Sequence, residues 1–213
     1  MPDLATILLL VPPILAALTF HEYAHGWAAY KLGDPTAKIA GRLTLNPLAH
    51  LDPVGAIMLF LFYFGWAKPV PVNPYNLRSP KTDMIWVSLA GPGANILLAA
   101  ILAVIIKPLL NYGLIDLFGI MYKMLTLAVF INLMLAFFNL LPVPPLDGSK
   151  VVAGLLPDHC LKWWGYFEMS GPFVLISLII LGRLTGVSVF GSTIFPLANG
   201  LYVLFTGGLP VHL

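Results

Sequence analysis

Long apolar segments limit the fold of this chain more than any other feature of its sequence. A helix needs about 20 mostly apolar residues to cross the roughly 30 Å hydrocarbon core of a bilayer. Four segments are long enough, at residues 4–30, 84–106, 118–141 and 167–184. A fifth, residues 190–206, is interrupted by Pro196, Asn199 and Gly200, so we expect it to be broken or tilted. The sequence therefore predicts an all-α polytopic membrane protein, a bundle of about five transmembrane helices.

The composition agrees with a membrane protein and excludes two other classes. Hydrophobic residues make up 59% of the chain and charged residues 9%, whereas a soluble domain has about 25% charged residues. The net charge of +2, spread over scattered Lys and Arg residues, is too small for a nucleic-acid interface. The single cysteine, Cys160, cannot form an internal disulfide. The N-terminus lacks the basic region and the cleavage site of a signal peptide, so we expect the first span to be retained.

One apolar segment, residues 54–67, is too short to cross the bilayer comfortably, because its helix would reach only about 21 Å at 1.5 Å per residue. If this segment enters and returns on one face, most basic residues share that face: Lys31, Lys38, Arg42, Lys68, Arg78, Lys81, Lys150 and Lys162. The opposite face of the membrane then carries only three basic residues, Lys107, Lys123 and Arg183. Cytoplasmic loops carry the excess of Lys and Arg. We therefore expect a re-entrant element and an N-terminus outside the cytoplasm.

Three ionisable residues stand close together inside the first span, in the motif HEYAH at residues 21–25. On a helix, His21 and His25 project from one face with Glu22 beside them. This is the HExxH arrangement, in which two imidazoles bind zinc and a carboxylate stands over its water. The alternative is that the histidines are hydrogen-bonded interior residues and that Glu22 is buried and protonated. Charge in hydrocarbon is costly, so three such residues in register favour a shared metal site.

Catalytic zinc usually has three protein ligands and an open fourth position. The candidate for the missing ligand is Asp147, in the stretch FNLLPVPPLDGSK at residues 138–150. Its prolines end the third span, so we expect Asp147 on irregular backbone at the end of that helix. The alternative is an ordinary turn, since Asp and Gly are both frequent in turns.

These motifs give the chain a resemblance to the site-2 proteases, a family of intramembrane zinc metalloproteases. The resemblance is carried by HEYAH at residues 21–25, AGPGAN at residues 90–95 and NLLPVPPLDG at residues 139–148. It implies that His21, His25 and Asp147 bind one zinc ion and that Glu22 is the general base. It also implies a core formed by the first three full spans, with the metal toward the cytoplasmic side.

We expect one membrane domain over residues 1–213, with a catalytic core at about 4–150 and accessory spans at about 165–206. We expect no PDZ or CBS domain, a regulatory module that the family often carries. Control is therefore expected from a regulatory membrane partner, the substrate or the loops. The expected location is a prokaryotic inner or plasma membrane.

The activity that the resemblance implies is hydrolysis of a peptide bond within or near a transmembrane segment of a membrane-protein substrate, as in regulated intramembrane proteolysis. The alternative is a zinc or cation transporter, which would also place His and Asp inside a bundle. Transporters usually show inverted repeats, and this sequence shows none. A scaffold without activity would have no need of Glu22.

A helical substrate must be unwound before its peptide bonds can be attacked. The stretch AKPVPVNPYN, residues 67–76, has a pattern suited to holding it. In a strand, the backbone groups of Val70 and Val72 point to one edge, while Pro69 and Pro71 offer no N–H to the other. We expect Val70 and Val72 to clamp the substrate by β-addition. The alternative is a polyproline-like connector.

Two asparagines, Asn95 and Asn139, stand in apolar spans. The resemblance implies that they steady the oxyanion or the substrate backbone, and the alternative is interhelical hydrogen bonding. The small residues near Asn95 favour close packing of this helix on the zinc helix; they are Ser88, Ala90, Gly91, Gly93 and Ala94.

His50 and Asp52 are weaker candidates as metal ligands. With Asn46 and Pro47 they are more typical of a structured turn. His159 and His212 are assigned no role, and the turn-rich loop at residues 33–53 is a candidate entrance for water.

Overall fold

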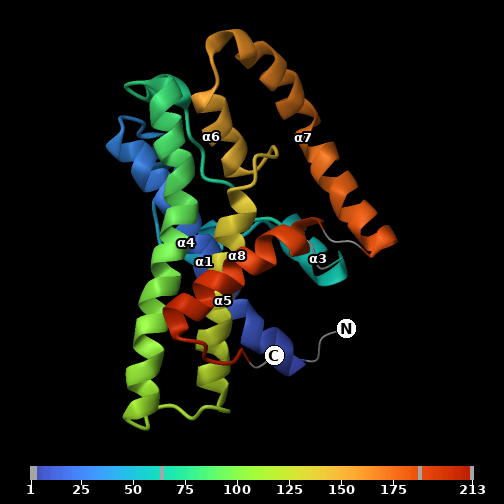
Figure 1. Cartoon of the computed structure of the whole chain (residues 1–213). Helices are drawn as coiled ribbons and strands as arrows, with labels where there is room; N and C mark the ends of the chain where they lie inside the picture. The colour runs from blue at the N-terminus through green and yellow to red at the C-terminus, as the bar shows by residue number, and fades with distance from the viewer. Residues whose placement is uncertain (1–3, 63–64, 187–188, 212–213) are drawn as a thin grey trace.

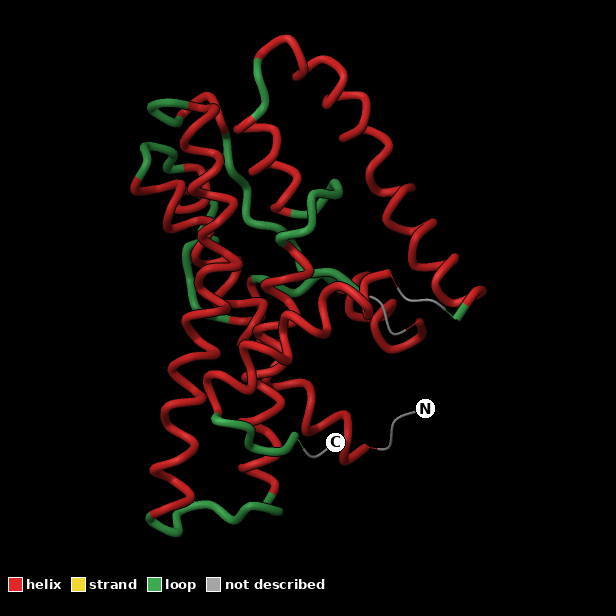
Figure 2. Tube along the Cα trace, viewed as in Figure 1, coloured by secondary structure: helices red, strands yellow, loops and turns green. Residues whose placement is uncertain are grey.

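The chain folds almost entirely into helices. The computed structural model describes residues 4–62, 65–186 and 189–211. The α-helices are α1 (Leu4–Lys31), α2 (Thr36–Ile39), α3 (Pro53–Phe62), α4 (Pro80–Asn111), α5 (Ile120–Asn139), α6 (Asp147–Leu155), α7 (Asp158–Thr185) and α8 (Val189–Thr206). Two 3-10 turns lie at Pro47–Ala49 and Pro74–Asn76. Within the described ranges no strand forms, and the extended stretches are connections between helices (Figure 2).

Among the residues that the structure describes, four helices are long and apolar enough to cross a membrane. They are Ile7–Lys31, Pro80–Asn111, Ile120–Asn139 and Asp158–Gly182. The expected multi-pass membrane protein is therefore confirmed, with four candidate spans among the described residues, while the expected count of about five is not confirmed. The fifth expected span is α8, a helix that continues through Pro196 and lies across α4 and α5 instead of beside them (Figure 1).

The core consists of α1, α4 and α5, which pack against one another side by side (Figure 1). This is the three-helix core that the resemblance implied. Small buried residues of α4, Ala99 and Ala103, let α5 approach closely, and Leu133 of α5 is fully buried there. Helix α7 stands away from this core (Figure 1). Its main contact with another helix is with α6.

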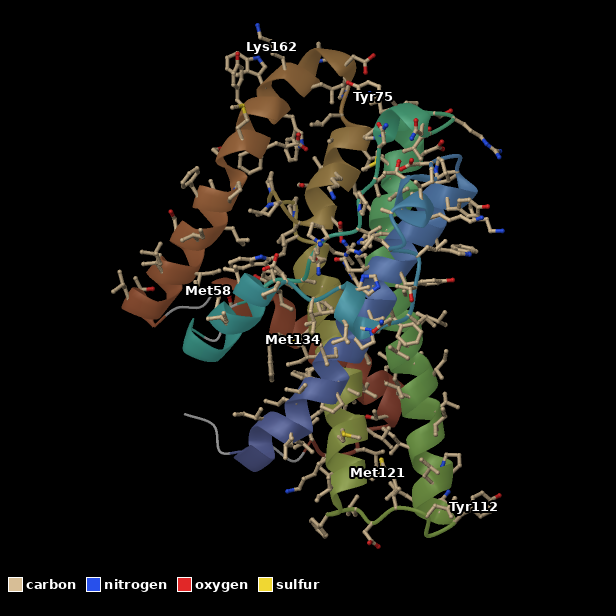
Figure 3. The ribbon with its side chains drawn as sticks, turned by 180° about the vertical axis from the view of Figure 1, so that it is seen from behind. Met58, Tyr75, Tyr112, Met121, Met134 and Lys162 are labelled. Atoms are coloured by element: carbon tan, nitrogen blue, oxygen red, sulfur yellow. The ribbon has the colours of Figure 1, made fainter. Side chains whose placement is uncertain are left out.

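The two ends of the bundle are distinct (Figure 3). Tyr75 and Lys162 lie at one end, whereas Tyr112 and Met121 lie at the other, beside the loop that joins α4 to α5. An ion pair between Lys81 Nζ and Asp158 Oδ1, 2.6 Å apart, joins the beginnings of α4 and α7 at the first end.

The short apolar segment begins and ends at nearly the same place. Asp52 Oδ1 accepts hydrogen bonds from the backbone N–H groups of Val54 and Gly55 and so starts α3. An antiparallel bridge pairs Leu51 with Ala67, which closes the segment at its base. Helix α3 spans only ten residues, or about 15 Å. The expected β element is limited, in the described residues, to this isolated bridge.

Candidate metal centre

The motif at residues 21–25 lies wholly within α1 and faces α4. His21 and His25 are 4% and 8% exposed, one helical turn apart on the same side of the helix. A Cβ atom at Gly91 would lie 2.4 Å from His25 Nε2 and 2.7 Å from His21 Cε1. The predicted packing of the small residues against the zinc helix therefore holds, and Gly91 is the residue that makes it close. Gly93 faces open space and contributes nothing to the contact.

Asp147 lies opposite the two histidines, although its backbone differs from the prediction. Helix α5 ends at Asn139, and the prolines at 142, 144 and 145 keep the following residues irregular. The chain becomes helical again at Asp147 itself, the first residue of α6. The expectation of irregular backbone at this position was wrong because an acidic residue in the first turn of a helix is favoured by the helix dipole.

Gly148 allows this turn to form. A Cβ atom there would lie 2.2 Å from the carbonyl oxygen of Leu140 and 2.4 Å from that of Leu141. A larger residue would therefore push Asp147 away from the end of α5. The Asp-Gly pair has a steric reason as well as its turn preference.

The structure brings Asp147 next to His21 and His25, although it lies more than 120 positions after them in the sequence. Asp147 Oδ2 lies 3.1 Å from His21 Nε2 and 3.1 Å from His25 Nε2, and the two Nε2 atoms are 3.0 Å apart. Neighbouring ligand atoms around tetrahedral zinc are about 3.3 Å apart, given bonds of about 2.0 Å. The spacing therefore fits a small divalent cation.

The hydrogen bonds on the far side of each ring fit a cation as well. His25 Nδ1 donates to the carbonyl oxygen of Val87 at 2.7 Å, and His21 Nδ1 donates to Asn95 Oδ1 at 2.6 Å. Each neutral imidazole then presents a lone pair at Nε2. With both rings in this neutral form, two lone pairs and a carboxylate oxygen converge on one point, so a bound cation would stabilise the cluster.

A cavity of about 640 Å³ opens beside these three residues. Glu22 lines it, as do Val70, Val72, Asn139 and Lys150. Glu22 Oε2 accepts a hydrogen bond of 2.8 Å from the backbone N–H of Val70. The candidate base therefore lies next to the candidate ligands and contacts the segment predicted to hold a substrate.

The two asparagines have different surroundings. Asn95 is fully buried, and its amide joins α1 to α5, which matches the interhelical alternative. Asn139 lines the cavity, while its amide nitrogen donates to the carbonyl oxygen of Leu135 in its own helix. Only Asn139 of the two is placed where a substrate could reach it.

The extended segment that carries Val70 and Val72 is fixed at both ends. The backbone N–H of Lys68 donates to His50 O at 2.9 Å, and that of Asn73 donates to Asp34 Oδ2 at 2.7 Å. Burial raises the pKa of Asp34, but hydrogen bonds from Thr36, Asn76 and Asn73 outweigh it and hold the pKa below its ordinary value. Asp34 was not singled out from the sequence, where it stands in a simple Gly-Asp-Pro turn.

The remaining ionisable candidates lie away from the cluster. His50 Nε2 donates to the carbonyl oxygen of Thr44 at 2.8 Å, and Asp52 starts α3, so the turn interpretation is confirmed for both. His159 and Cys160 lie on α7, and His212 falls outside the described residues. Among the residues that the structure describes, His21, His25 and Asp147 form the one group suited to a metal ion.

Comparison with known proteins relates most of the chain to metalloproteases. The model of "Peptidase family M50" matches residues 116–162, which include Asp147. "Putative zinc metalloprotease YwhC" of Bacillus subtilis is 41% identical over 174 residues, which cover 80% of each chain. "Putative zinc metalloprotease MJ0611" of Methanocaldococcus jannaschii is 32% identical over 76% of this chain and 71% of its own.

A more distant relative is "Putative zinc metalloprotease Rip2" of Mycobacterium tuberculosis. It is 29% identical over 78% of this chain and 63% of its own length. No solved structure matches the chain.

Proposed function

The chain belongs to peptidase family M50, the site-2 protease family, and from this premise we propose that it is an intramembrane endopeptidase. Its substrate would be another membrane protein, cut within or near a transmembrane segment. The observation that carries the proposal is the convergence of His21, His25 and Asp147 beside a cavity that Glu22 also lines. These three residues would hold the zinc ion that the relatives' names imply.

Two polar residues of the cavity, Glu22 and Asn139, have a place in the proposed chemistry. Zinc, when bound, supplies a Lewis acid for the scissile carbonyl and lowers the pKa of water to about 7. Glu22 would accept a proton from the attacking water and pass it to the leaving amine. Asn139 is the asparagine available to the oxyanion or the substrate backbone, because it lines the cavity. Asn95 is less suited to this role, because its amide is occupied in the core.

The extended segment at residues 68–73 would receive the unwound substrate. Val70 and Val72 both line the cavity, and backbone pairing with an edge is an established way to hold an extended peptide. The N–H of Val70 is bonded to Glu22 before substrate arrives. A substrate carbonyl that pairs with this N–H would release the Glu22 carboxylate close to the bond to be cut.

The placement of the protein in the membrane completes the proposal. We propose that the segment at residues 54–67 is re-entrant, since its two ends meet at the bridge between Leu51 and Ala67. The end that carries Tyr75 and Lys162 (Figure 3) would then face the cytoplasm of a prokaryotic cell, in line with the excess of Lys and Arg that the sequence predicts for one side. A regulatory membrane protein remains part of the hypothesis.

Cleavage of a model single-span peptide by the purified protein in detergent tests the proposed function. Glu22→Gln should lower the rate by about 10²–10⁴-fold, because it removes the base, and should leave the zinc content unchanged. A chelator should stop cleavage by the unmodified protein, and added zinc should restore it. Zinc flux into proteoliposomes without peptide cleavage would instead favour the transporter.

A further inference from the structure

A chain of buried side-chain amides crosses the three core helices behind the metal centre. Asn95 of α4 and Asn132 of α5 are both fully buried. Asn95 Nδ2 donates to Asn132 Oδ1 at 2.7 Å and to the carbonyl oxygen of Ala17 at 3.0 Å. Asn132 Nδ2 donates to the carbonyl oxygen of Ala128 at 2.8 Å. We propose that Asn95 and Asn132 are positioning residues that fix the ring orientation and the tautomer of His21.

The direction of this chain follows from its two backbone ends. A carbonyl oxygen can only accept a hydrogen bond. Ala128 O therefore requires the NH₂ group of Asn132 on its side, which turns Asn132 Oδ1 toward Asn95. Ala17 O and Asn132 Oδ1 together require the NH₂ group of Asn95, which turns Asn95 Oδ1 toward His21.

The hydrogen bond between Asn95 and His21 determines which ring nitrogen of His21 carries the proton. Because Asn95 Oδ1 can only accept, His21 must carry its proton on Nδ1, and the bond between them is 2.6 Å. The lone pair of His21 then lies on Nε2, which faces His25 and Asp147. Neither asparagine lines the cavity, and among the hydrogen bonds of the described residues His21 is the candidate ligand that this chain of amides reaches.

The other histidine needs no such chain. His25 Nδ1 donates directly to the backbone carbonyl of Val87 at 2.7 Å, and no side-chain substitution removes that acceptor. Second-shell partners of this kind typically change metal affinity by about 10–100-fold when they are lost. The sensitivity of the metal centre to side chains behind it should therefore be concentrated at His21.

The test measures zinc affinity by chelator competition on the full-length protein in detergent. Asn95→Ala should weaken zinc binding by about 10–100-fold, and Asn132→Ala by roughly tenfold, because Asn95 can then rotate. The double variant should be no weaker than Asn95→Ala alone, since Asn132 acts only through Asn95. With Co(II) in place of zinc, both single variants should shift the ligand-field absorption bands.

Thr126→Val is the matched control. Thr126 is fully buried on the same helix as Asn132, and its hydroxyl bonds only to backbone carbonyls of that helix. This variant should keep the zinc affinity and the Co(II) spectrum, even if it lowers thermal stability. If Asn95→Ala fails to fold, Asn132→Ala carries the test alone.

Two outcomes would overturn the inference: unchanged zinc affinity in both asparagine variants, or additive losses in the double variant. The inference rests on the ligand set of the proposed function, and His21→Ala separates the two failures. If His21→Ala still binds zinc at the native affinity, the ligand set is wrong. If His21→Ala loses zinc while the asparagine variants keep it, only the positioning role is wrong.

Discussion

The core helices α1, α4 and α5 and the outer helix α7 are similarly apolar, yet they differ in what they bury. The most apolar window of α7 has a mean hydropathy of 1.5, and 11% of that window is buried in the protein. The corresponding window of α5 has a mean hydropathy of 1.9, and 44% of it is buried. The core helices bury Thr19, His21, His25, Ser88, Asn95, Thr126 and Asn132. Among its described residues, α7 buries no serine, threonine, asparagine or ionisable side chain.

This difference shows what fixes a helix inside a membrane. Apolar side chains gain little from choosing a neighbouring helix over lipid, because lipid is equally apolar. A buried amide or imidazole must find its hydrogen-bond partner, since an unpaired polar group there is costly. The buried histidines and asparagines, which bond from one helix to another, therefore set the register of α1, α4 and α5, whereas α7 is positioned mainly by its connections.

The contact between Gly91 of α4 and the His25 ring of α1 should give the largest effect on the core helices. Gly91→Ala would place a Cβ 2.4 Å from His25 Nε2, so the ring or the helix must move. We expect zinc affinity to fall by about tenfold or more, although alanine favours the helix by about 1 kcal/mol. Chelator competition measures the loss.

Gly93→Ala is the control on the same turn, because no atom of another described helix or loop lies within 4 Å of its Cβ position. Its zinc affinity should match that of the native protein. Equal losses in both glycine variants would mean that the helix backbone, and not the contact with His25, matters here.

The extended segment beside the core should respond next most strongly. Val72→Pro removes the backbone N–H proposed to pair with substrate, so kcat/KM for a single-span peptide should fall by roughly tenfold, the value of one or two lost hydrogen bonds. Zinc content should not change. Val72→Ala keeps the N–H and should cleave nearly as well; if the two variants lose equal activity, the side chain and not the backbone is responsible.

Asp34, which holds the end of this segment at Asn73, should have a smaller effect, on stability, that depends on pH. Asp34 accepts hydrogen bonds from Thr36, Asn73 and Asn76. In Asp34→Asn one of the accepting oxygens becomes an NH₂ group that cannot accept, and we expect this to lower the free energy of unfolding by about 1 kcal/mol. Because folding lowers the pKa of Asp34, its stabilising contribution is present above the ordinary value of 3.8 and is lost as pH falls through the lower, folded-state value. Thermal unfolding midpoints in detergent should therefore converge in acid; a gap that widens would contradict this account.

The sequence predicted the parts of the site that depend on local chemistry. Helical spacing places His21, Glu22 and His25 on neighbouring faces, and the small residues around Gly91 indicate close packing. The run of prolines before Asp147 predicted the end of the preceding helix, which the structure places at Asn139. These inferences needed no knowledge of which helix lies beside which.

What the sequence could not supply depends on tertiary register. Asn132 stands in an apolar span and looks like any asparagine bonded within its own helix, until α4 places Asn95 beside it. The bond between Glu22 and Val70 joins residues 48 positions apart, and Asp34 meets Asn73 across 39. The start of α7 at Asp158 instead of residue 167 reflects a polar first section that hydropathy alone does not mark as helix.

Helix α7 provides the smallest expected effect. Leu181 is 53% exposed, and truncating an exposed side chain leaves no cavity in the protein. Leu181→Ala should therefore change the free energy of unfolding by no more than about 0.5 kcal/mol. Peptide cleavage should be unaffected. In native membranes the same variant should also behave normally if α7 meets only lipid. A clear loss of activity there, without a loss in detergent, would show that α7 packs against another protein and would place the regulatory partner on this face.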